Sequence, residues 1–175
     1  ELWLCLRRQR DIFMKKINFL TQAAMIAALY VVLTLAINAF GLASGAIQVR
    51  VSEALTILPY FTPAAIPGLF IGCLLSNTIT GCALFDIIFG SIATLLGAVG
   101  TYLLRRHKWL APISPIIANT IIVPFVLSYV YGTPGTIPYL MLTVGIGEVL
   151  SCGVLGMVLL FALNKYRTTL FGVQN

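Results

Sequence analysis

Hydrophobic residues in this chain form long continuous runs instead of recurring at helical or alternating spacing. Five runs stand out, each bounded by Gly, Pro or charged residues: 19–39, 64–79, 83–104, 110–131 and 136–163. A run of about 20 apolar residues spans the hydrocarbon core of a bilayer as an α-helix. The pattern therefore predicts an all-α membrane protein.

The composition agrees with lipid as the main solvent. Of the 175 residues, 59% are hydrophobic and 9% are charged, and the mean hydropathy is +1.00. A soluble domain of this size has roughly a quarter of its residues charged. A soluble domain is therefore excluded, and the length leaves no room for a second domain beside five or six spans.

A sixth segment, residues 49–61, is too short to score as a span by itself. The basic residues that flank the runs decide whether it crosses the membrane, because such residues collect on the cytoplasmic side. They form three clusters: Arg7, Arg8, Arg10, Lys15 and Lys16; Arg105, Arg106 and Lys108; and Lys165 and Arg167. All three fall on one side only if the segment crosses, so we predict a six-transmembrane-helix bundle with both termini cytoplasmic.

The ends of the chain are interpreted separately from this bundle. Met14 is followed by Lys15 and Lys16, which is typical of a bacterial start, so residues 1–13 are taken as an N-terminal extension outside the native protein. Residues 14–167 are predicted to form one transmembrane domain. Residues 168–175 are predicted to be a short cytoplasmic tail.

Few charged residues remain within or beside the predicted helices, and a charge in hydrocarbon is costly unless it is paired or faces the interior. They are Arg50, Glu53, Asp86 and Glu148, accompanied by the amides Asn38, Asn77 and Asn119. The predicted topology brings Arg50, Glu53, Asn77 and Asp86 to the outer side. The alternative is structural: Arg50 pairs with Glu53 three residues later, and Asp86 caps its helix.

Three acids against one base leave an excess of negative charge in the bundle. Such an excess favours a proton path or a cationic ligand rich in hydrogen-bond donors, whereas an anionic substrate would need Arg or Lys. Glu148, about twelve residues into its apolar run, is the acid that a structural role explains least well.

Sequence motifs of catalysis are missing from these 175 residues. They contain no GxxxxGK[ST], HExxH or GxSxG motif, and His107 lies in a basic loop. Cys5, Cys73, Cys82 and Cys152 lack the spacing of a zinc site. We therefore predict no enzyme activity, no catalytic or metal-binding residue, no cofactor in this chain and no nucleic-acid partner, despite the net charge of +6.

Small residues recur at helix-packing intervals. Two overlapping pairs, Ala23 with Ala27 and Ala24 with Ala28, lie in the first run, and Gly68 with Gly72 lies in the third segment. Such spacing lets helix backbones approach closely in lipid. The pairs on the first helix fit either packing within the bundle or docking of another membrane subunit.

Two stretches carry a family resemblance: QVRVSEALTILPYFTPAAIPGLFIGCLLSN and FDIIFGSIATLL. With the Ala-xxx-Ala pairs and the six predicted helices, they resemble the substrate-binding S components of energy-coupling factor (ECF) transporters, and specifically the queuosine-precursor transporter (QueT) family. The resemblance extends from Met14 to about Leu163.

The resemblance implies a multi-pass protein of the bacterial cell membrane that captures a deazaguanine precursor of queuosine, in its aminomethyl form, on the outer side. It implies partners that use ATP: one transmembrane coupling subunit, met by the alanines at 23, 24, 27 and 28, and two ABC ATPases. The substrate-binding set would be Arg50, Glu53, Asn77, Asp86 and Glu148. A carboxylate would accept two N–H donors from the guanine-like edge.

Three alternatives remain at this point. The chain could be an S component for a different vitamin or small heterocycle, or a proton-coupled carrier that works alone with Glu148 as the proton site. The third is a small membrane enzyme that uses paired acids, which the missing nucleophile and metal motifs disfavour.

Overall fold

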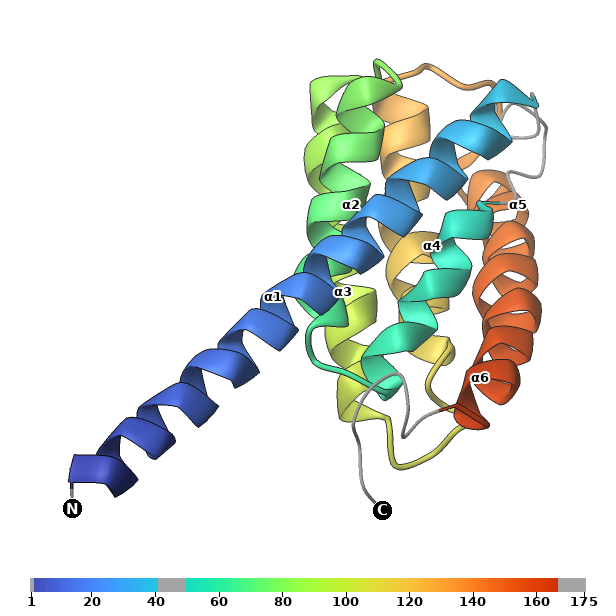
Figure 1. Ribbon diagram of the computed structural model, residues 1–175. Helices are drawn as coiled ribbons and strands as arrows, with labels where there is room; N and C mark the ends of the chain where they lie inside the picture. Colours follow the sequence, from blue (N-terminus) through green and yellow to red (C-terminus); the bar gives the residue numbers. More distant parts are fainter. Residues whose placement is uncertain (1, 41–49, 167–175) are drawn as a thin grey trace.

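The computed structural model describes residues 2–40 and 50–166, and all regular elements in that part of the chain are helical (Figure 1). The order is α1 (Leu2–Ala39), the 3₁₀-helix η1 (Val51–Tyr60), α2 (Ala65–Ile79), α3 (Leu84–Leu103) and α4 (Ile113–Tyr129), followed by a last helix in three parts. These parts are α5 (Ile137–Glu148), the π-helical η2 (Val149–Leu155) and α6 (Gly156–Asn164). The predicted all-helical fold is confirmed.

Three helices are long and apolar enough to cross a membrane: 12–39 within α1, α3, and the continuous helix from Ile137 to Asn164. The helices α2 and α4 are apolar but shorter. Helix α1 begins well before the predicted position 19, and in Figure 1 it runs obliquely across the bundle and projects beyond it at its N-terminal end. The chain is thus a multi-pass membrane protein.

The segment predicted as the second helix adopts 3₁₀ geometry. Its residues from Ser52 to Tyr60 are all buried, and Pro59 lies within it. A 3₁₀-helix rises about 2.0 Å per residue, compared with 1.5 Å in an α-helix. Ten residues therefore extend over about 20 Å of the bundle, whereas ten residues of α-helix would extend over only about 15 Å. Val49, the predicted first residue of this segment, lies outside the described residues, as do Arg167 and the predicted tail 168–175.

Helices α1 and α2 pack with their backbones in close contact. A Cβ atom on Gly68 would lie 2.7 Å from the carbonyl oxygen of Ala23, and one on Gly72 would lie 2.8 Å from the Cβ of Tyr30 and 3.1 Å from the Cα of Ala27. In lipid, helices associate through such packing because the hydrophobic effect does not distinguish a neighbouring helix from acyl chains. The small residues at these positions therefore hold α1 on the bundle.

This packing corrects part of the predicted docking face. Ala23 and Ala27 are buried against α2 and are not available to another subunit, whereas Ala24 and Ala28 are exposed. Two residues that follow one another in a helix point in different directions, so the two overlapping pairs belong to different faces of α1.

Candidate functional site

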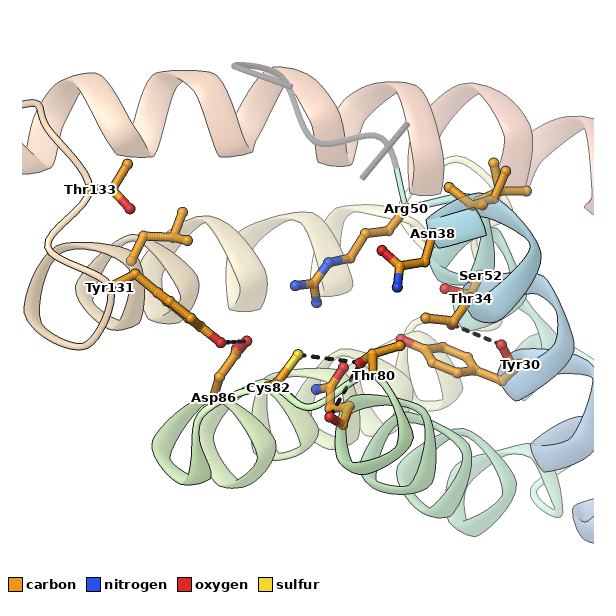
Figure 2. Close-up of a pocket in the computed structure, with 14 residues that line it drawn as sticks. Tyr30, Thr34, Asn38, Arg50, Ser52, Thr80, Cys82, Asp86, Tyr131 and Thr133 are labelled. Carbon is orange, nitrogen blue, oxygen red and sulfur yellow. Dashed lines mark hydrogen bonds between the residues drawn. The ribbon is translucent and has the colours of Figure 1, made fainter. Parts of the chain in front are cut away.

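One end of the bundle contains a polar pocket of about 350 Å³, within the range of roughly 300–1,000 Å³ that is usual for small-molecule sites. Its walls come from α1, the start of η1, the ends of α2, α3 and α4 nearest the pocket, the α2–α3 turn and the α4–α5 connection. In Figure 2 the guanidinium of Arg50 extends into the space between Tyr30 and Tyr131. Fourteen residues line it: Tyr30, Thr34, Ile37, Asn38, Arg50, Val51, Ser52, Asn77, Thr80, Cys82, Asp86, Leu127, Tyr131 and Thr133.

Three of the five predicted substrate-binding residues meet in this pocket: Arg50, Asn77 and Asp86. Arg50 precedes η1, and Asn77 and Asp86 lie on either side of the α2–α3 turn, so the pocket contains both a cation and a carboxylate. Asn38, one of the polar amides noted in the sequence, lines it as well. The structure thus brings these positions together at one end of the bundle, whereas Glu53 does not line the pocket.

Asp86 is engaged by a tyrosine from the opposite loop. The hydroxyl of Tyr131 donates to Oδ2 of Asp86 at 3.0 Å and accepts from the backbone N–H of Ala83 at 3.1 Å. Asp86 lies in the first turn of α3, but no side-chain hydrogen bond caps that helix. The Asp86 carboxylate thus faces the pocket and the α4–α5 connection, and the capping alternative does not hold.

Partial burial, together with the negative charge of Asp86, raises the pKa of Tyr131 to about 12, against the opposing contribution of the Ala83 N–H bond. Tyr131 follows the end of α4 and lies outside the membrane-spanning helices. Its hydroxyl therefore remains a proton donor to Asp86 over the physiological pH range.

Glu53 and Glu148 do not line the pocket; they lie in a buried polar cluster next to it, which we call the acid cluster: Tyr30, Glu53, Thr94, Asn119, Glu148 and Cys152. Glu53 is 1% exposed, and its carboxylate accepts hydrogen bonds from Tyr30, from Thr94 at 3.5 Å and from Asn119 at 3.5 Å. The side chains of Arg50 and Glu53 thus have different surroundings, contrary to the pairing alternative.

Glu148 enters the cluster from the last helix. The thiol of Cys152 donates a hydrogen bond to the Glu148 carboxylate at 3.2 Å. A carboxylate oxygen of Glu53, a carboxylate oxygen of Glu148 and the sulfur of Cys152 all lie within 4.8 Å of one another. The helix changes to π geometry directly after Glu148. Single π-helical turns occur frequently at functional sites.

Tyr30 connects the two regions. It is 2% exposed, it lines the pocket, and its hydroxyl donates to Glu53. The sequence did not single out Tyr30 or Tyr131, because tyrosine carries no charge and is common at the ends of membrane helices. The helical spacing gave part of the information: Tyr30 lies three residues after Ala27, so it shares the face of α1 that packs against α2.

A second, larger hollow of about 740 Å³ lies between α3 and α4, and its lining is almost entirely apolar. Phe85 and Phe89 stack on one side, and Phe125 and Tyr129 stack on the other. A surface of this kind fits lipid chains in a membrane protein. The smaller pocket, with its convergent charges, is the candidate site.

Comparison with known proteins is consistent with the resemblance seen in the sequence. A family model described as QueT transporter matches residues 20–165. The chain belongs to the QueT transporter family. It is 37% identical over 86 residues to a protein of Lactococcus lactis subsp. cremoris (strain MG1363) named Queuosine precursor transporter QueT.

That alignment covers 49% of this chain and 50% of the Lactococcus protein, so it spans about half of the relative's length. No solved structure matches this family member.

Proposed function

We propose that this protein is the substrate-binding S subunit of an ECF-type ABC importer and captures a queuosine precursor at the outer face of the bacterial cell membrane. The observation that carries the proposal is the pocket in which Arg50, Asn77 and Asp86 meet, in a member of the QueT transporter family. A pocket with these groups suits a planar heterocycle with both donors and acceptors.

The proposed topology has six crossings and cytoplasmic termini. Successive elements connect at alternating ends of the bundle in Figure 1, and η1 would count as the second crossing. The pocket lies at one end, with the α2–α3 and α4–α5 connections. The basic residues of 105–108 and Lys165 follow α3 and α6 at the other end, which favours that end as cytoplasmic.

We propose residues 14–167 as the substrate-binding unit, with 1–13 as an N-terminal extension and 168–175 as a cytoplasmic tail. The family match to residues 20–165 supports the central part of this division.

The ligand that fits best is a deazaguanine with a protonated aminomethyl group. Asp86 would accept a hydrogen bond from the ammonium group, because it is the carboxylate on the pocket wall. Arg50 and Asn77 would donate to the ring carbonyl. Charged hydrogen bonds of this kind contribute about 1.5–3 kcal/mol each, so two or three of them would account for selective capture.

Glu53 and Glu148 would act from behind the pocket wall. Both are buried, and Glu53 reaches the pocket through its bond with Tyr30. A negative charge shared by these two neighbouring acids would favour a cation in the adjoining pocket, and rotation of Tyr30 would expose Glu53 to the N–H donors of the guanine-like edge. We therefore keep both acids in the proposed binding set, Glu53 closer to the ligand than Glu148.

ATP would be used by partner subunits. The chain carries no GxxxxGK[ST] motif in its printed sequence, so two ABC ATPases and a transmembrane coupling subunit would supply the energy. The exposed face of α1 with Ala24 and Ala28 is the proposed contact with the coupling subunit.

The direct test is calorimetric titration of the purified protein with the aminomethyl deazaguanine, with guanine and an unrelated vitamin as controls. We expect binding of the deazaguanine alone among the three, and native mass spectrometry is expected to detect the same molecule in protein purified from cells. Binding of the vitamin instead would make the chain an S component for another small molecule.

A second candidate is a proton-coupled carrier that works alone, which the buried pair of Glu53 and Glu148 favours. Reconstitution discriminates the two. The S-subunit proposal predicts uptake only with the coupling module and ATP, whereas uptake by this chain in ATP-free liposomes under a proton gradient would support the solo carrier.

The docking face has its own test. Ala28→Trp is expected to leave ligand binding unchanged and to abolish uptake by the assembled complex, because a bulky side chain would separate α1 from the coupling subunit. Leu142→Trp, at a position on α5 that is 63% exposed, is the matched control and is expected to transport normally. Normal uptake by the Ala28→Trp protein would exclude this face as the contact.

A further inference from the structure

The end of the bundle opposite the pocket carries a surface that the transport proposal does not use. The connection between α3 and α4 turns tightly there: His107 N–H bonds to the Leu104 carbonyl at 2.9 Å, and Ala111 N–H bonds to the His107 carbonyl at 3.3 Å. The hydroxyl of Thr101 donates to the carbonyl of Ala111 at 3.1 Å and ties the connection to α3. This connection is therefore built into the fold.

Trp109 projects from this anchored connection and pairs with an aromatic residue of the last helix. Trp109 is 72% exposed although Ala111, two residues later, is fully buried. Its ring meets Phe161 of α6 edge to face, with centroids 5.9 Å apart and planes inclined at 64°. Tryptophan rings at such positions lie at the level of the lipid headgroups.

Two lysines flank the aromatic pair. Lys108 directly precedes Trp109 in the sequence. Lys165 lies four residues after Phe161, so Phe161 and Lys165 share one face at the end of α6. Both lysines are exposed. The sequence has no Asp or Glu between residues 87 and 147 or after residue 148, so no acid on α3, α4 or α6 is close in sequence to neutralise them.

We propose that Lys108, Trp109, Phe161 and Lys165 form a binding site for an anionic phospholipid. The two ammonium groups would hold the headgroup phosphate, and the Trp109–Phe161 pair would pack against the upper part of an acyl chain. Arg105 contributes less, because its guanidinium lies 4.3 Å from the ring centroid of Tyr102, whereas the ammonium of Lys165 makes only a longer contact of 5.8 Å with the ring centroid of Tyr166. The proposal is independent of which ligand occupies the pocket.

Native mass spectrometry of the detergent-solubilised protein tests the site, with phosphatidylglycerol and phosphatidylcholine of identical acyl chains. We expect preferential retention of phosphatidylglycerol. The Lys108→Gln/Lys165→Gln variant is expected to lose about 20-fold of that preference, since each lysine near an anionic headgroup contributes roughly fivefold in binding constant. Trp109→Leu is expected to weaken retention of both lipids.

The matched control is Lys15→Gln/Lys16→Gln, which removes the same charge from the exposed part of α1 and is expected to keep the preference. An equal loss in the control would overturn the proposal in favour of general charge attraction. No preference in the wild type would also overturn it. If the Lys108→Gln/Lys165→Gln variant kept the lipid preference but failed to assemble with the coupling module, the surface would be a protein interface instead.

Discussion

The pocket and the acid cluster are neighbours that share Tyr30, yet they use their charges in opposite ways. In the pocket, Arg50 and Asp86 face about 350 Å³ of space. In the acid cluster, the Glu53 carboxylate is surrounded by protein donors, and Glu148 is bonded by Cys152. A carboxylate that lines a pocket is available to a ligand, whereas a buried carboxylate that accepts hydrogen bonds from three side chains, as Glu53 does, contributes first to the fold.

The difference predicts two kinds of mutational effect. Changes in the pocket should act mainly on ligand affinity, and changes in the acid cluster mainly on stability. Tyr30 belongs to both regions, so its variants should show both effects in smaller measure.

Asp86→Asn is expected to have the largest effect on affinity. It removes the carboxylate on the pocket wall but keeps the shape, and loss of a charged hydrogen bond costs about 1.5–3 kcal/mol, or roughly tenfold to 100-fold in Kd. Calorimetric titration with the aminomethyl deazaguanine measures it. Glu148→Gln is the comparison, with a smaller expected loss of about threefold, because Glu148 acts on the ligand only from behind the pocket wall; the reverse order of the two variants would place the ligand in the acid cluster.

Glu53→Gln is expected to have the largest effect on stability. The amide introduces N–H donors where Tyr30, Thr94 and Asn119 already donate, in a position that is 1% exposed. A buried donor left without an acceptor costs about 1–3 kcal/mol. Thermal unfolding in detergent should show a clearly lower Tm than for Asp86→Asn, and equal Tm values would contradict the separation of the two regions.

Tyr30→Phe is expected to lower both the affinity for the ligand and the stability of the fold moderately. It removes one donor to Glu53 without opening space in the core, which corresponds to about 0.5–1.5 kcal/mol for an ordinary hydrogen bond. Titration and thermal unfolding of the same preparation measure the two effects. A change in only one of them would show that Tyr30 does not connect the regions.

Tyr131→Phe is expected to have the smallest effect, a change of about twofold to threefold in Kd, because Tyr131 is half exposed and acts on the ligand only through Asp86.

The pKa of Tyr131 is raised to about 12 in the folded protein, so its hydroxyl is protonated at every pH below the unfolded pKa of about 10. Its contribution to stability is therefore constant at neutral pH and is lost only as the pH rises toward 12. The ratio of the Kd values of wild type and variant should be equal at about pH 6 and pH 9. A ratio that changes with pH would identify another titrating group.

Much of the fold could be predicted from the sequence, because long apolar runs and their Gly, Pro and basic boundaries are local features. The 3₁₀ geometry of η1 and the π-helical turn after Glu148 could not. Both depend on how far a segment must reach inside the bundle and on which neighbours it packs against. The same limit applies to the alanines of α1, where only the position of α2 decides that Ala23 and Ala27 are covered.

The site could be predicted in composition but not in arrangement. Scarcity of charge in lipid singled out Arg50, Asp86 and the two glutamates. Their division between a pocket and a buried cluster depends on the partners that Tyr30, Thr94 and Asn119 supply from three other helices. In the sequence, Glu148 was the acid that a structural role explained least well. In the fold, its carboxylate accepts a hydrogen bond from the thiol of Cys152, one helical turn later.

The most direct test of the central claim is a double-mutant cycle between Asp86 and the amine of the ligand. Wild type and Asp86→Asn are each titrated with the aminomethyl deazaguanine and with the analogue that carries a methyl group instead. We expect that the wild type prefers the amine by about tenfold or more and that Asp86→Asn loses this preference. A preference of equal size in both proteins would contradict the assignment of the pocket as the site of capture.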